Sequence, residues 1–222
     1  MSMMLDGQLV AQPVFSPAAE RNKQDIRAQL QRILPASGSA LEIASGTGQH
    51  VVCFAATLPG WTWQPTDAAR DALRTIAANT QGAGLRNVRA PLQVDVLSPA
   101  WLQASGPPPG DGLGRALFNA IYCANLLHIA PWATCAALMH GAATRLAPGG
   151  QLIIYGPYLE DDVPTSDGNQ AFDHSLRSSN PAWGLRRRED VQACAQQAGL
   201  VLQARHAMPA NNLLLVFGRA AT

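Results

Sequence analysis

Two glycines and one carboxylate have the types and spacing of a site that binds a nucleoside. Gly46 and Gly48 stand where an apolar segment ends and a helical pattern begins, and glycine there lets the backbone approach a ligand closely. Asp67 lies 21 residues beyond Gly46, at the end of the next apolar segment. An acidic side chain at this point can accept hydrogen bonds from both ribose hydroxyls. The pattern therefore favours an adenosine-containing ligand over a simple tight turn.

Alternating apolar segments and helical patterns predict the elements that position these residues. Ser16-Pro17 predicts a helix start, because serine caps helices well and proline suits the first helical position. We predict a doubly wound, mostly parallel, seven-stranded α/β sheet that ends in an antiparallel hairpin. The expected strands are Ala40–Ala44, Trp61–Thr66, Val88–Val96, Ala116–Ala124, Gln151–Tyr155, Leu200–Arg205 and Leu213–Gly218.

The whole chain, residues 1–222, is expected to be one domain, with residues 1–15 as an N-terminal extension. Residues 156–186 interrupt the strand–helix pattern with polar residues and prolines, as a substrate loop or lid does. One short helix is expected there, around 171–176. The arginines at 186–188 are expected on a solvated helix face.

The amino-acid composition limits the classes of molecule that the protein is expected to bind. Sixteen basic and fifteen acidic side chains give a net charge of +1, so neither nucleic acid nor a membrane is expected as a partner. The four cysteines form no Cys-x-x-Cys pair, which argues against a metal site and favours a reducing cytoplasm. No secretory leader or spanning apolar run is recognisable. A small-molecule partner fits best, and the oligomeric state stays open.

The glycine turn departs from the dinucleotide fingerprint, because Val51 occupies the place of the third glycine. With Glu42 inside the first strand, the turn resembles motif one of the class I S-adenosylmethionine-dependent methyltransferases, which have a Rossmann-like fold. The strings LEIASGTGQH, WQPTD, APLQVDV and NPAWGLR are similar to one family within that class. It is the uncharacterised methyltransferase-like family of unknown function numbered 938, which includes methyltransferase-like protein 26.

The resemblance implies S-adenosyl-L-methionine as the cofactor. It places Glu42, Gly46 and Gly48 at the ligand and Asp67 at the ribose. It places Asp95 and Val96 at the adenine, and Asn125 at the end of the fourth strand. Arg21 and Asn22 lie over the pocket in this reading, with Arg21 on the methionine carboxylate; the alternative is a pair on the helix surface.

His128 is the candidate general base, because an imidazole can deprotonate an acceptor N–H or O–H. The alternatives are that His128 caps the following helix, or that methyl transfer needs only proximity and no base. Tyr158 is a second catalytic candidate, since an aromatic face attracts a sulfonium cation.

The candidate substrate-binding residues are Tyr155, Asp173, Arg177 and Asn211. The alternative is that Asp173 and Arg177 tie down their own loop and that Asn211 forms a turn.

The chain is thus expected to be a methyltransferase that acts on a small-molecule acceptor. A non-catalytic S-adenosylmethionine-binding or scaffold protein is the main alternative. An NAD-dependent oxidoreductase is less favoured, because the third glycine is missing.

Overall fold

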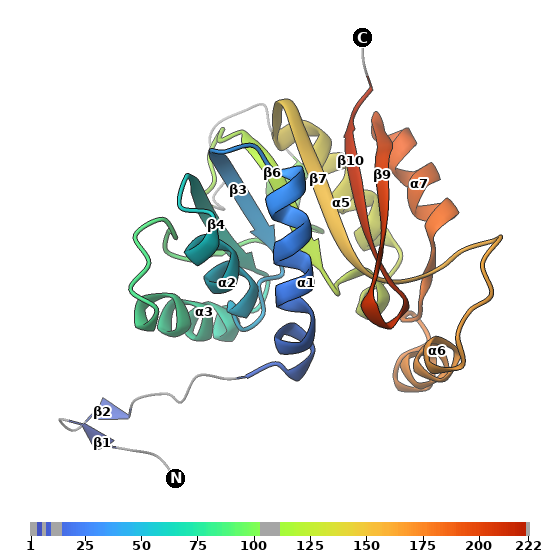
Figure 1. Cartoon of the computed structure of the whole chain (residues 1–222), viewed down its shortest axis with the longest axis horizontal. Helices are drawn as coiled ribbons and strands as arrows, with labels where there is room; N and C mark the ends of the chain where they lie inside the picture. The colour runs from blue at the N-terminus through green and yellow to red at the C-terminus, as the bar shows by residue number, and fades with distance from the viewer. Residues whose placement is uncertain (1–3, 6–7, 10–14, 103–111, 221–222) are drawn as a thin grey trace.

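The computed structural model describes residues 4–5, 8–9, 15–102 and 112–220. A central β-sheet runs through most of this range (Figure 1). Its strands are β3 (Gly38–Ile43), β4 (Trp61–Asp67), β5 (Leu92–Gln93), β6 (Phe118–Ala124), β7 (Leu146–Leu159), β8 (Arg186–Arg187), β9 (Leu200–Met208) and β10 (Asn212–Arg219).

The order across the sheet is β5-β4-β3-β6-β7-β10-β9, and β8 pairs with β7. Neighbours from β5 to β7 are parallel, whereas β10 is antiparallel to both β7 and β9. The expected doubly wound sheet with a closing antiparallel hairpin is confirmed. The chain order reverses between β3 and β6, and at such a switch point the connections diverge and leave a crevice at the strand ends.

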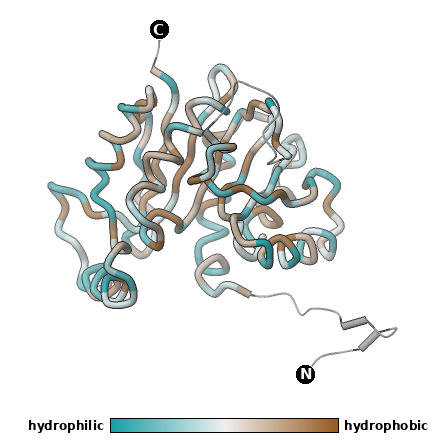
Figure 2. Tube along the Cα trace, turned by 180° about the vertical axis from the view of Figure 1, so that it is seen from behind, coloured by the Kyte–Doolittle hydropathy of each residue, from teal (hydrophilic) through white to brown (hydrophobic). Residues whose placement is uncertain are grey.

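Helices cover both faces of the sheet (Figure 1). They are α1 (Pro17–Ile33), α2 (Gln49–Thr57), α3 (Arg70–Gly82), α4 (Pro99–Leu102), α5 (Ala133–Arg145), α6 (Asp167–Ser179) and α7 (Arg188–Gln197), with 3-10 turns η1 (Leu127–Ile129) and η2 (Pro209–Asn211). Buried residues of α1 and α2 pack on one sheet face, and those of α4, α5 and α7 pack on the other. The apolar segments gather along the central strands, whereas α6 lies apart from the sheet (Figure 2).

The first helix starts as its sequence predicts. Ser16 caps α1 by accepting a hydrogen bond from the Ala19 amide, and Pro17 takes the first helical position. Of the expected extension 1–15, residues Met4–Leu5 (β1) and Gln8–Leu9 (β2) form a small antiparallel pair. The rest of residues 1–14 lies outside the described residues.

The largest differences from the expected element boundaries occur at three elements. The third strand is reduced to Leu92–Gln93, although Val88 still bridges to β4. The fifth strand continues to Leu159, because its far end pairs with β10 on one side and with the added strand β8 on the other. The helix expected at 171–176 spans Asp167–Ser179, with Ser166 as its N-cap. The segment 156–186 is therefore built largely of regular structure.

Candidate functional site

A cavity of about 1050 Å³ opens where β3, β4, β6 and β7 end. Ligand sites of doubly wound sheets lie at this edge. Side chains from α1, η1, α6 and η2 complete its walls. Of the residues predicted from the sequence, the cavity brings together Arg21, Asn22, Gly46, Asp67, Asn125, His128 and Tyr155.

The glycine turn after β3 presents open backbone to the cavity. Gly46 has a φ of +58°, and a Cβ atom added there would meet nothing within 4 Å. Gly48, at φ +75°, serves a different purpose, because its Cβ would lie 3.3 Å from the backbone of Ile76. Gly48 therefore allows α2 and α3 to pack closely and does not line the cavity. Ala44 also adopts a left-handed conformation at this turn, with φ 55°.

Asp67 is fixed at the end of β4 by two backbone amides. Its Oδ2 accepts a hydrogen bond from the Gly46 N–H at 2.9 Å, and its Oδ1 accepts one from the Ala69 N–H at 2.9 Å. Each carboxylate oxygen keeps a further acceptor position. Asp67 lines the cavity. The carboxylate is thus preorganised to accept two hydroxyl hydrogens from a ligand.

Glu42 lies beneath the cavity on β3 and is 1% exposed. Neither of its carboxyl oxygens has a hydrogen-bond partner among the described residues. Burial raises the pKa of Glu42 to about 8; the Asp67 charge adds to this effect and the Ser45 side chain opposes it. Tyr122, which pairs with Glu42 in the neighbouring strand, also has a buried hydroxyl for which the described part of the chain offers no hydrogen-bond partner. Glu42 is therefore mostly uncharged at neutral pH.

We expect the free energy of unfolding to depend on pH in a way that reflects the raised pKa of Glu42. Glu42 stays protonated in the fold up to about pH 8 but ionises near pH 4.5 when unfolded. Unfolding therefore releases a proton between these values, and the folded state loses stability as the pH rises through them. Between about pH 5 and about pH 8, wild type should lose on the order of 3 kcal/mol more unfolding free energy than Glu42→Gln, which cannot ionise.

Urea unfolding at several pH values measures this difference. Glu20→Gln is the matched control, because the exposed Glu20 carboxylate pairs with Lys23 and its pKa is lowered, so it does not titrate in this range. Stability curves of wild type and Glu42→Gln that run parallel from pH 5 to pH 8 would contradict the assignment.

On the side of the cavity formed by α1, the structure shows polar contacts and a lining residue that the sequence analysis did not predict. Asn22 Oδ1 lies 2.7 Å from Nε2 of His50, the geometry of a hydrogen bond that the ring N–H donates. His50 is buried, and burial lowers its pKa to about 4, so the ring is neutral at pH 7. Asp25 also lines the cavity, one helical turn after Arg21. Sequence reasoning missed Asp25, which the i, i+4 spacing from Arg21 could have revealed.

The opposite wall centres on His128 in η1. His128 is 7% exposed and lines the cavity, and its ring makes a T-shaped contact with the ring of Phe172 at 5.6 Å between centroids. Burial, and then the charge of Arg186, lowers the pKa of His128 to about 4. A neutral imidazole therefore faces the cavity at physiological pH. Phe172 and Asn169, both from α6, are lining residues that the sequence analysis missed.

Tyr158 does not line the cavity. Because β7 runs on past Tyr155, alternate side chains point to opposite faces of the sheet. Tyr155 and Pro157 line the cavity, whereas Tyr158 is buried in the core on the other face. A catalytic role of Tyr158, which lies outside the cavity lining, therefore stays a prediction. Tyr155 is the member of this pair that reaches the site, and burial raises its pKa to about 12.

Asp173 and Arg177 hold α6 in place and do not line the cavity. They form an i, i+4 ion pair at 2.8 Å, and Asp173 Oδ1 accepts a hydrogen bond from the Leu185 amide at 2.6 Å. Asn211 lies in η2, where its side chain donates to Ser166 Oγ at 2.9 Å. These contacts agree with the structural alternatives, a tied loop and a turn former.

Asp95 and Val96 also lie outside the cavity lining. Asp95 Oδ1 accepts a hydrogen bond from the Leu97 amide at 2.9 Å and is exposed, while Val96 is 5% exposed in the core. An adenine contact at these residues stays a prediction.

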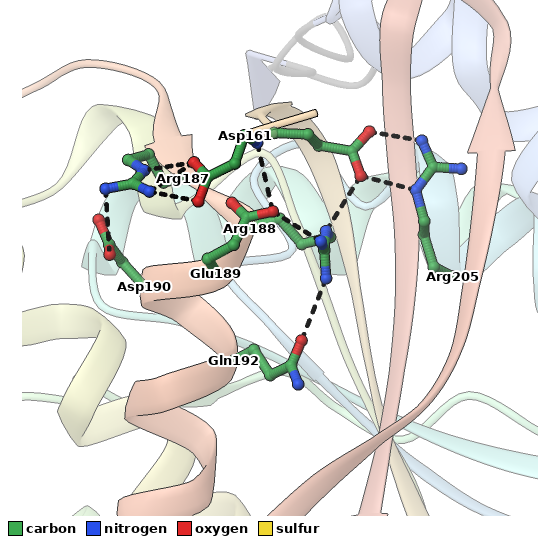
Figure 3. Close-up of polar contacts among 8 residues, drawn as sticks. Asp161, Arg187, Arg188, Glu189, Asp190, Gln192 and Arg205 are labelled. Atoms are coloured by element: carbon green, nitrogen blue, oxygen red, sulfur yellow. Dashed lines mark hydrogen bonds and ion pairs between the residues drawn. The ribbon is translucent and has the colours of Figure 1, made fainter. Parts of the chain in front are cut away.

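Two of the arginines expected on a solvated helix face are instead held in an ion-pair network (Figure 3). Arg187 pairs with Asp161, and Arg188 pairs with Glu160 at 3.0 Å. Glu160 also pairs with Arg205 of β9, whose hydrogen bond is the main reason that the Glu160 pKa is lowered. Exposed pairs add little stability singly, but here they join the end of β7 to α7 and β9.

Among the described residues, no group of three or more His, Cys, Asp and Glu side chains is placed to hold a metal ion. Within the same part of the chain, no helix has both the length and the apolar character needed to cross a membrane.

Solved methyltransferases share this fold. The mitomycin 7-O-methyltransferase MmcR matches with a TM-score of 0.74 and 14% identity, over 91% of this chain and 54% of that protein. The O-methyltransferase family 2 protein from Planctomyces limnophilus DSM 3776, in complex with apigenin, matches with 0.70 and 18%, over 91% and 60%. CalO1, a methyltransferase in calicheamicin biosynthesis in its SAH-bound form, matches with 0.68 and 12%, over 91% and 56%.

The strand order, the closing hairpin and these likenesses define the fold of a class I S-adenosylmethionine-dependent methyltransferase. This chain spans between 54% and 60% of the length of these three proteins. A family model described as "Protein of unknown function (DUF938)" matches residues 13–219. The chain belongs to this family, as its sequence strings indicated.

Proposed function

We propose that this protein is an S-adenosylmethionine-dependent methyltransferase that methylates a hydroxyl group of a small molecule. The observation that carries the proposal is one cavity that holds both a preorganised acidic group and a neutral imidazole. Asp67 beside the open glycine turn suits a ribose, and His128 lies on the opposite wall. The similar solved proteins include O-methyltransferases, which supports a hydroxyl acceptor.

The lining residues at the glycine turn, at the end of β4 and on α1 suit an adenosyl ligand that carries a methionine group. Asp67 would hold the ribose hydroxyls, and the backbone at Gly46 would lie against the methionine portion. Arg21 and Asp25 offer a cation and an anion from one face of α1 to its carboxylate and ammonium groups. S-adenosylmethionine supplies an electrophilic methyl group on a sulfonium sulfur. Asp95 and Val96 remain the proposed adenine contacts.

His128 would accept the proton of the acceptor hydroxyl. A ring with a lowered pKa is a weak base toward a resting hydroxyl. The hydroxyl becomes far more acidic as its oxygen forms a bond to the methyl carbon, so a neutral imidazole within reach suffices at that moment. His128 thus needs to be neutral and oriented, and its burial secures the neutral form.

The segment 156–186 would bind the acceptor through α6. Phe172 places an aromatic ring next to the His128 ring, and Asn169 adds an amide to the same cavity lining. A small molecule suits a cavity of about 1050 Å³, and the net charge of +1 gives no reason to expect nucleic acid. We propose a cytoplasmic location, since Cys53, Cys123, Cys135 and Cys194 are all free thiols.

Calorimetric titration of the purified protein with S-adenosylmethionine, S-adenosylhomocysteine and NAD tests the ligand class. Binding of both adenosyl sulfur compounds and not of NAD is expected. Transfer of a labelled methyl group to a panel of phenols, alcohols, amines and thiols then tests turnover, with transfer to a hydroxyl compound expected. Binding without transfer to any hydroxyl, amine or thiol compound would favour the non-catalytic alternative, and binding of NAD alone would overturn the proposal.

A further inference from the structure

The Arg186 side chain is hydrogen-bonded to the short turn η1, which carries His128. Its Nε donates a hydrogen bond to the Leu127 carbonyl at 3.0 Å, and its Nη2 donates to the Ala130 carbonyl at 2.6 Å. The same Nη2 lies 2.7 Å from the Ala182 carbonyl. Its guanidinium also stands over the Trp132 ring, 5.7 Å from the centroid. One side chain thus contacts the backbone on both sides of His128.

The backbone two residues before Arg186 also binds this turn. The Gly184 amide donates a hydrogen bond to the His128 carbonyl at 3.0 Å. The carbonyls of Leu127, His128 and Ala130 are therefore all bound by residues 184–186. A single 3-10 turn has poor internal hydrogen-bond geometry. Donors from outside the turn therefore decide how η1 is held.

We propose that Arg186 is a positioning residue for His128, because it fixes the turn that aims the ring into the cavity. The positive charge of its guanidinium also opposes protonation of the ring. The cavity is lined by His128 and not by Arg186, so Arg186 would act through the histidine and not on a ligand. The inference deepens the proposed function, because it assigns a cause to the neutral and oriented state that the proposed proton transfer requires.

Of the charged and titratable groups near His128, Arg186 is the one whose charge lowers the pKa of the ring. From α6, Asp173 and Arg177 pair with each other. From β7, Tyr158 lies close to His128 across Gly156, and burial raises the pKa of its phenol well above the usual value. From α5, burial raises the pKa of the Cys135 thiol. Tyr158 and Cys135 are therefore neutral near pH 7. The guanidinium of Arg186 stays charged at any pH at which the protein folds.

Lysine cannot reproduce this arrangement. A guanidinium offers five donors in a rigid planar fork, whereas an ammonium is a compact point charge on a flexible stem. Arg186→Lys therefore keeps the charge and loses most of the carbonyl contacts, and Arg186→Met loses both. The two variants separate the positional effect of Arg186 from its electrostatic effect.

NMR titration of the histidine rings in the full-length protein measures the electrostatic effect, with His128 assigned by the signal lost in His128→Gln. In Arg186→Met the His128 pKa should rise above its wild-type value of about 4. It should stay below the usual histidine value, because burial is its larger cause and persists. Arg187→Met is the matched control: that neighbouring arginine pairs with Asp161 and is half exposed, so the His128 pKa should not move.

Amide hydrogen exchange measures the positional effect. The η1 amides should exchange at least about tenfold faster in both Arg186→Lys and Arg186→Met than in wild type or Arg187→Met. An unchanged His128 pKa in a folded Arg186→Met together with unchanged η1 exchange would overturn the proposal. If Arg186→Met does not fold, unchanged η1 exchange in Arg186→Lys overturns it equally.

Titration of the same variants with S-adenosylhomocysteine distinguishes a failure of the Arg186 proposal from a failure of the proposed function. Because Arg186 does not line the cavity, both variants should bind within about threefold of wild type. A wild-type protein that binds no adenosyl compound would refute the proposed function, whereas the His128 titration and η1 exchange would still decide the role of Arg186.

Discussion

Replacing Asp67 by alanine should weaken the binding of S-adenosylmethionine and S-adenosylhomocysteine by about 100-fold or more. The carboxylate is held by the amides of Gly46 and Ala69 and faces the cavity. A hydrogen bond to a charged group contributes about 1.5–3 kcal/mol, and a ribose supplies two hydroxyls. The variant also removes the acceptor that orders the glycine turn, which adds to the loss.

Two further variants sharpen this measurement, again by calorimetric titration. Asp67→Asn keeps the size and one acceptor oxygen without the charge, so its affinity should fall between those of wild type and Asp67→Ala. Asp71→Ala is the matched control, because Asp71 lies nearby on α3, is exposed and pairs only with Arg74 among the described residues. Wild-type affinity in Asp67→Ala would show that the adenosyl site lies elsewhere.

Replacing His128 by glutamine should lower turnover by about 100- to 10,000-fold once an acceptor is identified, the range typical of a lost general base. Binding of the adenosyl ligand should persist, because His128 follows β6 and Asp67 ends β4, and β3 lies between these two strands. His174→Gln is the matched control: this exposed histidine follows Phe172 on α6 and does not line the cavity. Equal turnover in His128→Gln and wild type would contradict the proposed role.

The pH profile gives a second test of His128. The ring must be unprotonated to accept a proton, and its pKa is lowered to about 4. Activity that depends on the neutral ring is therefore present above this value and is lost as the pH falls through it. The acid limb of kcat/KM should lie near pH 4, and a limb near pH 6.5 would mean that the ring is solvated in the working enzyme.

Sequence alone could predict the features that depend on short stretches of chain. The hydrophobic periods define the strands and helices, and their alternation restricts the topology to a doubly wound sheet. The turn at Gly46 and the acid at Asp67 follow two consecutive strands, which are neighbours in the sheet, so their proximity could be anticipated. The cap at Ser16 likewise depends on adjacent residues only.

Features that depend on contacts between distant segments escaped prediction. Tyr158 looked as available as Tyr155 until the pairing of β7 with β10 and β8 extended the strand and turned Tyr158 into the core. Phe172 and Asn169 gave no signal, because only the placement of α6 over the strand ends brings them to the cavity.

The sequence by itself determined the fold class, the glycine turn and the carboxylate of the proposed nucleoside site, because each follows from residues that are adjacent or lie on consecutive elements. Only the tertiary structure decided which side chains share the cavity and what charge they carry. Burial depends on every element packed around a group: it holds Glu42 uncharged beneath the cavity and leaves His128 neutral in its wall. No local pattern of residues encodes that environment.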